Sequence, residues 1–287
     1  LNLSTKKNYR FSLLLMKILK SYNPDTLIIT HEGYSWEKVV FKTAKNFNRK
    51  IKCIGYQHTG LTRYQTLLNE KLGQGFDPDL IWVTGKKVKN LLKKKNTVII
   101  GSNKANNYKI VKHRLNKLNC LVIPEGIMPE CKKIFNFSLK CAKLLPNINF
   151  IWRLHPMLNF KKIVNDFPNF KQLPKNIILS KNRDIYKDIY KSDICLYRGT
   201  STVYQAISYG IFPIYLSLNE RIDIDTSYNL KEWKMRLNNV DEFRNFINFK
   251  SHKILSSKKN RKIGINYSRN YFEKFKFNRA INLMVKK

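Results

Sequence analysis

Acidic residues are scarce in this sequence. Its 287 residues include 19 Asp and Glu against 55 Lys and Arg, which gives a formal net charge of +36. A chain with this charge attracts anions, such as nucleic acid, an anionic membrane or phosphorylated small molecules. The lysines are spread along the chain, as compositional drift in an AT-rich genome would leave them. We therefore favour drift combined with membrane or phosphate attraction, and we expect no nucleic-acid partner.

Long apolar runs and paired cysteines are also missing. The most apolar early run, residues 11–19, contains Lys17 and is far shorter than the roughly 20 residues that span a bilayer. The five cysteines include no CxxC pair, so neither a zinc site nor a disulfide framework is indicated. No GxGxxG, Walker A or GxSxG motif occurs. These absences favour a cytoplasmic protein, with contact at the inner face of the membrane left open.

What the sequence does contain is an alternation of short β-branched runs with amphipathic stretches. Such alternation is typical of parallel sheets covered by helices on both faces. The predicted strands are 26–30, 52–57, 80–84, 97–100, 120–124, 149–154, 176–179, 193–197 and 212–216. The predicted helices are 36–46, 85–95, 130–145, 185–191 and 202–209, followed by a basic helical tail from 231.

The alternation divides into two series. Residues 103–118 are polar and basic and have no reliable apolar period, which favours a linker. The prediction is an α/β protein with two doubly wound, Rossmann-like domains, residues 1–102 and 119–287, that face a cleft. The first series is short for a complete domain, so we expect an N-terminal domain that is shortened.

In open α/β sheets, ligands bind beyond the carboxyl ends of the strands. After the first predicted strand stands Glu32, beside Gly33, where a carboxylate suits either a general base or the start of a helix. Glu37, one helical turn further on, is either a second carboxylate of the site or a solvated helix residue. Glu37 and His58 are further candidates for the acceptor side of a site.

The second series carries its strongest signal at residues 197–202. The strand stops, Gly199 allows a tight turn, and Thr200, Ser201 and Thr202 precede a helix. Free N–H groups at a helix start bind phosphate, although an ordinary cap explains one such hydroxyl. Arg198, in the same turn, adds a positive charge.

Other strand ends of the second series carry polar groups as well. His155 follows a predicted strand, with Pro156 fixing the loop and Arg153 adding a planar cation. His155 either donates to a phosphate or only caps the strand. The remaining candidates at strand ends are Glu125, Gly126 and Ser180.

A DxD triplet at residues 223–225 lies in a polar loop. It shows no third ligand, so we expect no metal site.

In order, residues 31–33, 153–156 and 200–202 resemble three motifs of the GT-B glycosyltransferases that use CMP-activated acidic sugars. These enzymes include the bacterial sialyl-, polysialyl- and Kdo transferases. Two departures are visible: His31 replaces the first acidic residue, and Arg153-Leu154 replaces Lys-Gly. The departures leave the identity of the donor open.

The resemblance implies an inverting, metal-independent transferase without a cofactor. It would move an acidic sugar from a CMP-sugar donor to a glycan or glycolipid acceptor of the cell surface. Glu32 would be the base, and His155 with residues 200–202 would bind the donor phosphate. Glu125 would hold the ribose, and Arg153 or Arg198 the sugar carboxylate. Alternatives are a UDP- or GDP-sugar transferase or epimerase on the same fold, and a non-catalytic protein that binds nucleic acid or membrane.

Overall fold

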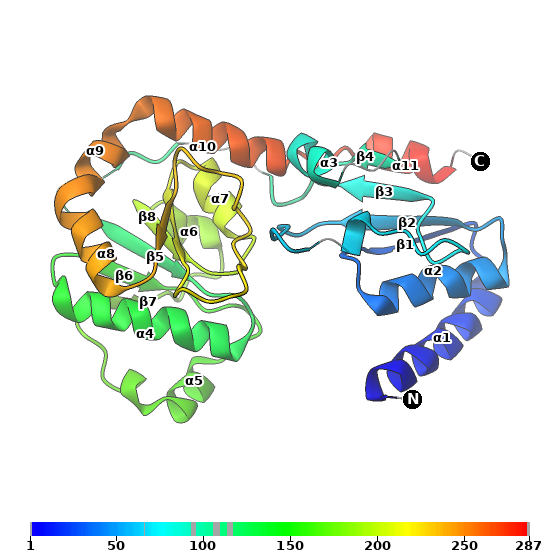
Figure 1. The fold of residues 1–287 in the computed structure, drawn as a ribbon, viewed down its shortest axis with the longest axis horizontal. Coiled ribbons are helices and arrows are strands. Elements are labelled where there is room, and N and C mark those ends of the chain that lie inside the picture. Colours follow the sequence, from blue (N-terminus) through cyan, green and yellow to red (C-terminus); the bar gives the residue numbers. More distant parts are fainter. Residues whose placement is uncertain (1, 66, 93–95, 106–109, 114–116, 286–287) are drawn as a thin grey trace. The chain divides into compact units, whose positions relative to one another are not determined.

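The computed structural model describes residues 2–65, 67–92, 96–105, 110–113 and 117–285 (Figure 1). The chain forms two compact units. The first unit contains Leu1–Thr59, Gln65–Asn106 and Asn270–Lys287, and the second contains Gly60–Tyr64 and Asn107–Arg269. Each unit is built on a parallel sheet, so the α/β prediction is confirmed.

The first unit has a sheet of four parallel strands in the order β1-β2-β3-β4 within its described residues. The strands are β1 (Thr26–Thr30), β2 (Lys52–Gln57), β3 (Leu80–Val83) and β4 (Thr97–Ile99). The helical elements are α1 (Leu3–Tyr22), α2 (Ser35–Phe47), η1 (Leu67–Asn69), α3 (Lys86–Leu92) and α11 (Phe277–Val285).

Alternation along β2 explains how both faces of this sheet are covered. Cys53 packs in a buried cluster with Phe41 of α2 and Leu19 of α1. The next residue, Ile54, points to the opposite face and packs with Trp82 and Ala280. Because side chains alternate along a strand, the two apolar neighbours serve two separate cores. In Figure 1, α1 and α2 lie together on one side of the sheet, and α11 lies beside β4 and α3.

Helix α11 corrects the predicted domain boundary. The sequence assigned residues 119–287 to the second domain, but the last 18 residues belong to the first unit. Thr26 Oγ1 donates to the carbonyl of Met284 at 3.3 Å, and Lys52 Nζ donates to that of Leu283 at 2.7 Å. The physical reason is that α11 covers the apolar face of the sheet around Ile54.

The second unit also takes in residues from outside the predicted range. Gly60–Tyr64 belong to it although they lie between elements of the first unit. Leu61 is buried, and a Cβ atom added to Gly60 would lie 2.9 Å from Cβ of Thr226. The chain therefore changes unit at four points. Of the predicted linker, residues 106–109 and 114–116 lie outside the described residues.

Within the described part of the second unit, six parallel strands form a sheet in the order β10-β9-β8-β5-β6-β7. Its strands are β5 (Asn119–Ile123), β6 (Asn149–Trp152), β7 (Ile177–Leu179), β8 (Ile194–Tyr197), β9 (Phe212–Leu216) and β10 (Met235–Leu237). Its helical elements are α4 (Met128–Leu144), α5 (Phe160–Asp166), η2 (Pro168–Phe170), α6 (Ile185–Ile189), α7 (Val203–Ser208), α8 (Val240–Asn245), η3 (Phe246–Lys250), α9 (Ser251–Ser256) and α10 (Lys258–Tyr271).

Two elements of the structure differ from the predicted ones. Strand β10 lies inside the tail that was predicted to be helical, where it pairs in parallel with β9. Helix α1 was not predicted; it begins after Asn2, whose side chain accepts from the N–H of Thr5, and ends at Asn23 in the left-handed region. No helix in the described part of the chain is both long and apolar enough to span a membrane.

Candidate functional site

The second sheet reverses its strand order between β5 and β8. The chain runs from β5 outward through β6 and β7, then returns to add β8, β9 and β10 on the other side of β5. At such a switch point the loops diverge and leave room for a ligand beyond the carboxyl ends of the strands. Glu125 follows β5 and Gly199 follows β8, so both stand at this point. Both residues were predicted site candidates, but only the strand order shows that they are neighbours.

Glu125 and Gly199 lie against each other. A Cβ atom added to Gly199 would lie 2.6 Å from Oε2 of Glu125, and Gly199 has a positive φ of 68°. Burial raises the pKa of Glu125, and the negative charge of Glu130 raises it further, against the opposing effects of Arg198 and Lys133. A carboxylate held where its charge is disfavoured is typical of functional sites. Its oxygens are suited to accept hydrogen bonds from hydroxyl groups.

His155 approaches the same place from the end of β6. A Cβ atom on Gly126 would lie 3.0 Å from Nδ1 of the ring, so the glycine permits this close approach. The N–H of Met157 donates to Nδ1 at 3.2 Å. Burial lowers the pKa of His155, which favours the neutral ring. Since Nδ1 accepts, the neutral ring carries its proton on Nε2, and that atom is the one able to donate to a ligand.

The Thr200–Thr202 turn differs in part from the predicted phosphate cradle. Helix α7, which follows it, has six residues, and the side chain of Thr202 makes no capping hydrogen bond. Thr200 instead accepts from the N–H of Thr202 at 3.3 Å through Oγ1, and its carbonyl accepts from Thr226. Ser201 and Thr202 are half-buried. The contribution of a helix dipole to phosphate binding is therefore small here.

Arg198 does not face a ligand, contrary to the sequence-based expectation. It is buried, and its guanidinium pairs with the carboxylates of Glu130 and Glu220. It also donates to the carbonyl of Leu216 at 2.7 Å. Lys133 completes the network, 2.6 Å from Glu130 and 2.7 Å from Glu220. The network ties the start of α4 to the end of β9, and so fixes both sides of the switch point.

Arg153 and Ser180 are also engaged within the protein. Arg153 Nη1 lies 2.5 Å from the buried carboxylate of Asp188, and Ser180 Oγ donates to the same carboxylate at 2.6 Å. Arg153 further donates to the carbonyls of Asn182 and Arg183. These contacts hold the loop after β7 against α6. No sequence pattern singled out Asp188, because its partner Arg153 lies 35 residues away.

In the first unit, Glu37 is not a solvated helix residue. It is 1% exposed. Its carboxylate accepts from the backbone N–H groups of Glu32, Gly33 and Tyr34 at 2.8 to 3.0 Å, and Nδ1 of His31 lies 3.0 Å from Oε2. Through these hydrogen bonds, the buried carboxylate of Glu37 fixes the β1–α2 turn. This geometry corrects the prediction that placed it on the acceptor side of a site.

The turn that Glu37 fixes presents Glu32 at the carboxyl end of β1. Oε1 of Glu32 lies 4.0 Å from Nδ1 of His58, which follows β2. This separation is too long for a hydrogen bond. The structure thus brings together two of the predicted candidates. A carboxylate beside an imidazole can take a proton from a hydroxyl group.

Two residues near Glu32 were missed by the sequence analysis. The pKa of Tyr34 is raised by burial and by the negative charge of Glu32. The pKa of Lys104 is lowered by burial, and the charge of Glu32 opposes this shift. Lys104 Nζ also lies 5.3 Å from the centre of the Phe272 ring. Because Lys104 is one of many lysines in a basic chain, no sequence pattern singles it out.

The acidic loop at residues 223–225 is structural. Asp225 lies 2.5 Å from Lys234 Nζ and accepts from the hydroxyl of Tyr197, while Asp223 pairs with Arg236 at 2.7 Å. Across the described residues, no group of three or more His, Cys, Asp or Glu side chains is placed to hold a metal ion.

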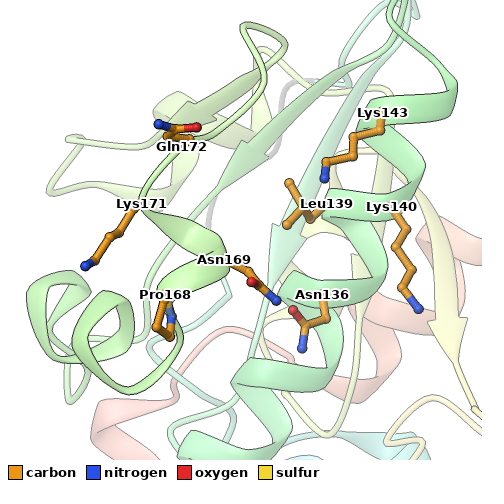
Figure 2. Close-up of a pocket in the computed structure, with 8 residues that line it drawn as sticks. All are labelled: Asn136, Leu139, Lys140, Lys143, Pro168, Asn169, Lys171 and Gln172. Carbon is orange, nitrogen blue, oxygen red and sulfur yellow. The ribbon is translucent and has the colours of Figure 1, made fainter.

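A groove of about 540 Å³ lies between α4 and η2 of the second unit, apart from the strand ends. Three lysines and three amide side chains border it: Lys140, Lys143, Lys171, Asn136, Asn169 and Gln172. Figure 2 shows Lys140 and Lys171 pointing away from its middle, whereas Asn169 points towards α4. Because its cations do not converge, the groove lacks the geometry of an anion site.

No model of a known protein family matches the sequence, and no curated protein matches it. The chain is similar in structure to the glycotransferase of kitacinnamycin, with a TM-score of 0.64 and 10% identity over 96% of this chain and 80% of the other. It is also similar to MurG of Acinetobacter baumannii, with a TM-score of 0.61 and 12% identity over 99% and 81%.

A third similar structure is a UDP-GlcNAc 2-epimerase from Neisseria meningitidis bound to UDP-GlcNAc. Its TM-score is 0.60, with 15% identity over 98% of this chain and 81% of the other. At these identities the likeness establishes the fold, and the predicted GT-B architecture of two parallel-sheet α/β domains is confirmed.

Proposed function

We propose that this protein is a glycosyltransferase that takes its sugar from a nucleotide-activated donor. The observation that carries the proposal is the switch point of the second sheet. There a carboxylate with a raised pKa, a histidine with its donor atom defined, and two glycines meet beyond the ends of β5, β6 and β8. Such a place binds nucleotides in doubly wound sheets. Two of the structures with this fold are the glycotransferase of kitacinnamycin and the glycosyltransferase SnogD of Streptomyces nogalater.

The residues of the second unit have separate roles in holding the donor. Glu125 accepts hydrogen bonds from the ribose hydroxyls, and Gly126 and Gly199 let the donor approach the backbone closely. His155 donates from Nε2 to the phosphate oxygen that leaves. The Thr200–Thr202 turn assists, although its Thr202 N–H already donates to Thr200 Oγ1. Arg198 and Arg153 position these loops through their buried ion pairs and do not bind the donor.

The first unit supplies the base. Glu32 takes the proton from a hydroxyl of the acceptor as that oxygen forms a bond to the anomeric carbon. The bond from the anomeric carbon to the phosphate oxygen breaks, and the electron pair leaves with the phosphate. The hydrogen bond from His155 stabilises the charge that develops there, which is an electrostatic contribution to rate.

The identity of the donor is a finer question. The prediction of a CMP-activated acidic sugar came from the resemblance of residues 31–33, 153–156 and 200–202, and it gave Arg153 or Arg198 as the partner of the sugar carboxylate. Both arginines are already paired with carboxylates of the protein. This observation favours a neutral sugar on UDP, the alternative that the similar structures with UDP or UDP-GlcNAc also favour. A 2-epimerase is the second candidate, on the same evidence.

A thermal-shift panel of CMP, UMP, UDP and GDP tests the donor. A nucleotide at 100 times its dissociation constant stabilises the folded protein by about 2.7 kcal/mol. We expect the largest rise in melting temperature with UDP. A larger rise with CMP would restore the acidic-sugar prediction, and no rise with any nucleotide would contradict the proposed function. Conversion of UDP-GlcNAc to its 2-epimer without an acceptor would identify an epimerase.

Two variants separate the roles of the base and the phosphate ligand. Glu32→Gln should lower turnover by about 10² to 10⁴, the usual range for general acid–base catalysis, and leave nucleotide affinity unchanged. His155→Ala should lower both, with affinity falling by about tenfold for one lost hydrogen bond. The matched controls are Glu232→Gln and His252→Ala, at exposed positions. Full activity of Glu32→Gln would remove Glu32 from the mechanism.

The proposed acceptor is a glycan or glycolipid of the cell surface, with the protein in peripheral contact with an anionic membrane. The net charge of +36 supports this contact.

A further inference from the structure

The first unit contains a cavity of its own, which lies beside Glu32, the proposed base. It has a volume of about 350 Å³ and opens between the first turns of α2 and the segment 67–76. Gly33 and Val39 line it from one side, and Leu67, Leu72 and Phe76 line it from the other. Leu67 is 50% exposed and Leu72 is 60% exposed. Two large apolar side chains of one segment thus stand in contact with solvent at the rim of a hollow.

We propose that this cavity binds an apolar part of the acceptor, an alkyl chain or an aromatic ring, while the reacting hydroxyl lies at Glu32. The inference rests on the proposed function, because it names the substrate class that the same site would accept. The acceptor would therefore be a sugar or a hydroxyl carried on an apolar group, such as a glycolipid or an aryl glycoside, and not a free, fully polar oligosaccharide.

The lining of the cavity argues for an apolar ligand. Lys38 is a charged residue at its wall, but Lys38 is buried and lies 2.6 Å from the carboxylate of Asp77. Its charge is therefore matched within the protein. Ser35 and the exposed Glu70 also border the cavity and are its remaining polar side chains. The other walls are formed by Val39 of α2 and by Leu67, Leu72 and Phe76. Ligand pockets combine such walls with few polar groups and have volumes of about 300 to 1,000 Å³.

The size of the cavity limits the ligand. At about 30 Å³ for each water molecule in the liquid, the hollow has the volume of about a dozen waters. A chain of about eight carbons or a bicyclic ring would fill it. A longer chain would extend past Leu72 into solvent, so affinity should stop rising with chain length.

The cavity is continuous with the base through the backbone. Gly33 lines the hollow and is the next residue after Glu32, so their Cα atoms are about 3.8 Å apart. A Cβ atom on Gly33 would lie 2.8 Å from Cβ of Leu67, which shows how closely the wall packs on this turn. Glu37 holds the N–H groups of both Glu32 and Gly33. One rigid turn therefore places the carboxylate and the cavity wall in a fixed relation.

Calorimetric titration with methyl, hexyl, heptyl and octyl β-glucoside, below their micelle concentrations and without a nucleotide, tests the proposal. Each buried methylene contributes about 0.8 kcal/mol, which corresponds to about a fourfold gain in affinity. We expect affinity to rise about fourfold from hexyl to heptyl and again to octyl. Affinity that does not depend on chain length would overturn the proposal.

Leu72→Ser and Leu14→Ser form a matched pair. Both leucines are exposed on the first unit, Leu72 at the cavity and Leu14 on α1, with exposed fractions of 60% and 58%. Because both side chains are exposed, neither substitution should prevent folding. Leu72→Ser should weaken octyl glucoside at least threefold and leave methyl glucoside unchanged. Leu14→Ser should change neither, and an equal loss in both variants would overturn the proposal.

Two other occupants would give different results. Self-association that rises with protein concentration and is lost in Leu72→Ser would identify a second copy of the chain. Flotation with phosphatidylglycerol vesicles that is lost in Leu72→Ser, without binding of octyl glucoside, would identify a lipid surface. Either result would overturn the assignment to an acceptor. Failure of the proposed function would appear instead as the absence of any nucleotide-induced thermal shift.

Discussion

At the residue scale, the charged side chains near the strand ends of the second unit fall into two groups. Arg198 and Arg153 are matched by carboxylates inside the protein, and their role is to position loops. Glu125 is different, because burial and the nearby Glu130 disfavour its charge. A residue whose charge destabilises the fold is expected to be useful for something other than folding. This contrast supports the proposal that Glu125 binds the donor.

We predict that Glu125→Gln keeps or raises stability at pH 8 while it weakens nucleotide binding by about tenfold or more. The folded-state pKa of Glu125 is raised above the ordinary value of 4.5. The folded protein therefore holds the proton more tightly, and stability falls as pH rises from about that ordinary value through the folded pKa. Glutamine removes this cost. Thermal melting of both proteins at pH 4.5 and pH 8 should show an advantage for the variant only at pH 8.

A lower melting temperature for Glu125→Gln at pH 8 would contradict this interpretation. It would mean that attraction to Arg198 and Lys133 outweighs the cost of burial.

At the element scale, the β1–α2 turn is the part of the first unit that a functional site depends on most. Glu37 reaches back from the first turn of α2 and accepts three backbone N–H groups of the turn. An acidic residue at a helix start is stabilised by the free N–H groups and the positive helix end. Here the same contacts also fix the turn that carries Glu32 and forms a wall of the apolar cavity. The same hydrogen bonds of Glu37 therefore cap the helix and hold the turn that carries Glu32, the proposed base.

Removing Glu37 should damage both stability and activity. Glu37→Ala leaves three N–H groups and the ring of His31 without their acceptor, and each buried polar group left without a partner costs about 1 to 3 kcal/mol. Denaturant unfolding should show this loss, and turnover should fall because Glu32 is displaced. Glu32→Gln serves as the control, since it should lower turnover with little effect on stability. A Glu37→Ala protein as stable as the native one would show that the turn forms without this carboxylate.

At the scale of the whole molecule, the chain is threaded back and forth between its units. The first unit is completed by α11, from the far end of the sequence, and the second includes Gly60–Tyr64. Each unit is therefore closed only when distant parts of the chain have come together. Folding of the first unit needs contacts between residues more than 200 positions apart, as in the hydrogen bond from Lys52 to Leu283. Such contacts are slow to form because of the entropy of closing long loops.

Ala280→Asp should destabilise the first unit and leave the second intact. Ala280 is buried in α11 against Ile54 and Trp82, so the new carboxylate would be placed among apolar side chains at a cost of about 3 kcal/mol or more. The expected result is a lower melting temperature with nucleotide affinity unchanged. Asn278→Asp is the matched control, because it adds the same charge at an exposed position of the same helix. Equal stability of the two variants would show that α11 does not form part of the core.

Much of the framework could be predicted from the sequence alone, because its signals are local. Strands β1, β2 and β9 have the predicted bounds, since each is a short run with β-branched or aromatic side chains. The alternation of strands and helices was enough to give the α/β class. Polar residues after two other predicted strands, β5 and β6, identified Glu125 and His155 correctly as strand-end residues. Their roles remain predictions.

Other features were decided only by the tertiary structure. Arg198 lies 68 residues from Glu130 and 22 from Glu220, so no sequence window contains its ion pairs. Strand β10 has three residues and a charged centre, and it exists because β9 offers it an edge. The placement of α11 depends on an apolar sheet face that forms only after β2, β3 and the following residues have assembled. Local periodicity tells which face of an element is apolar, whereas the order of the strands determines which residues become neighbours.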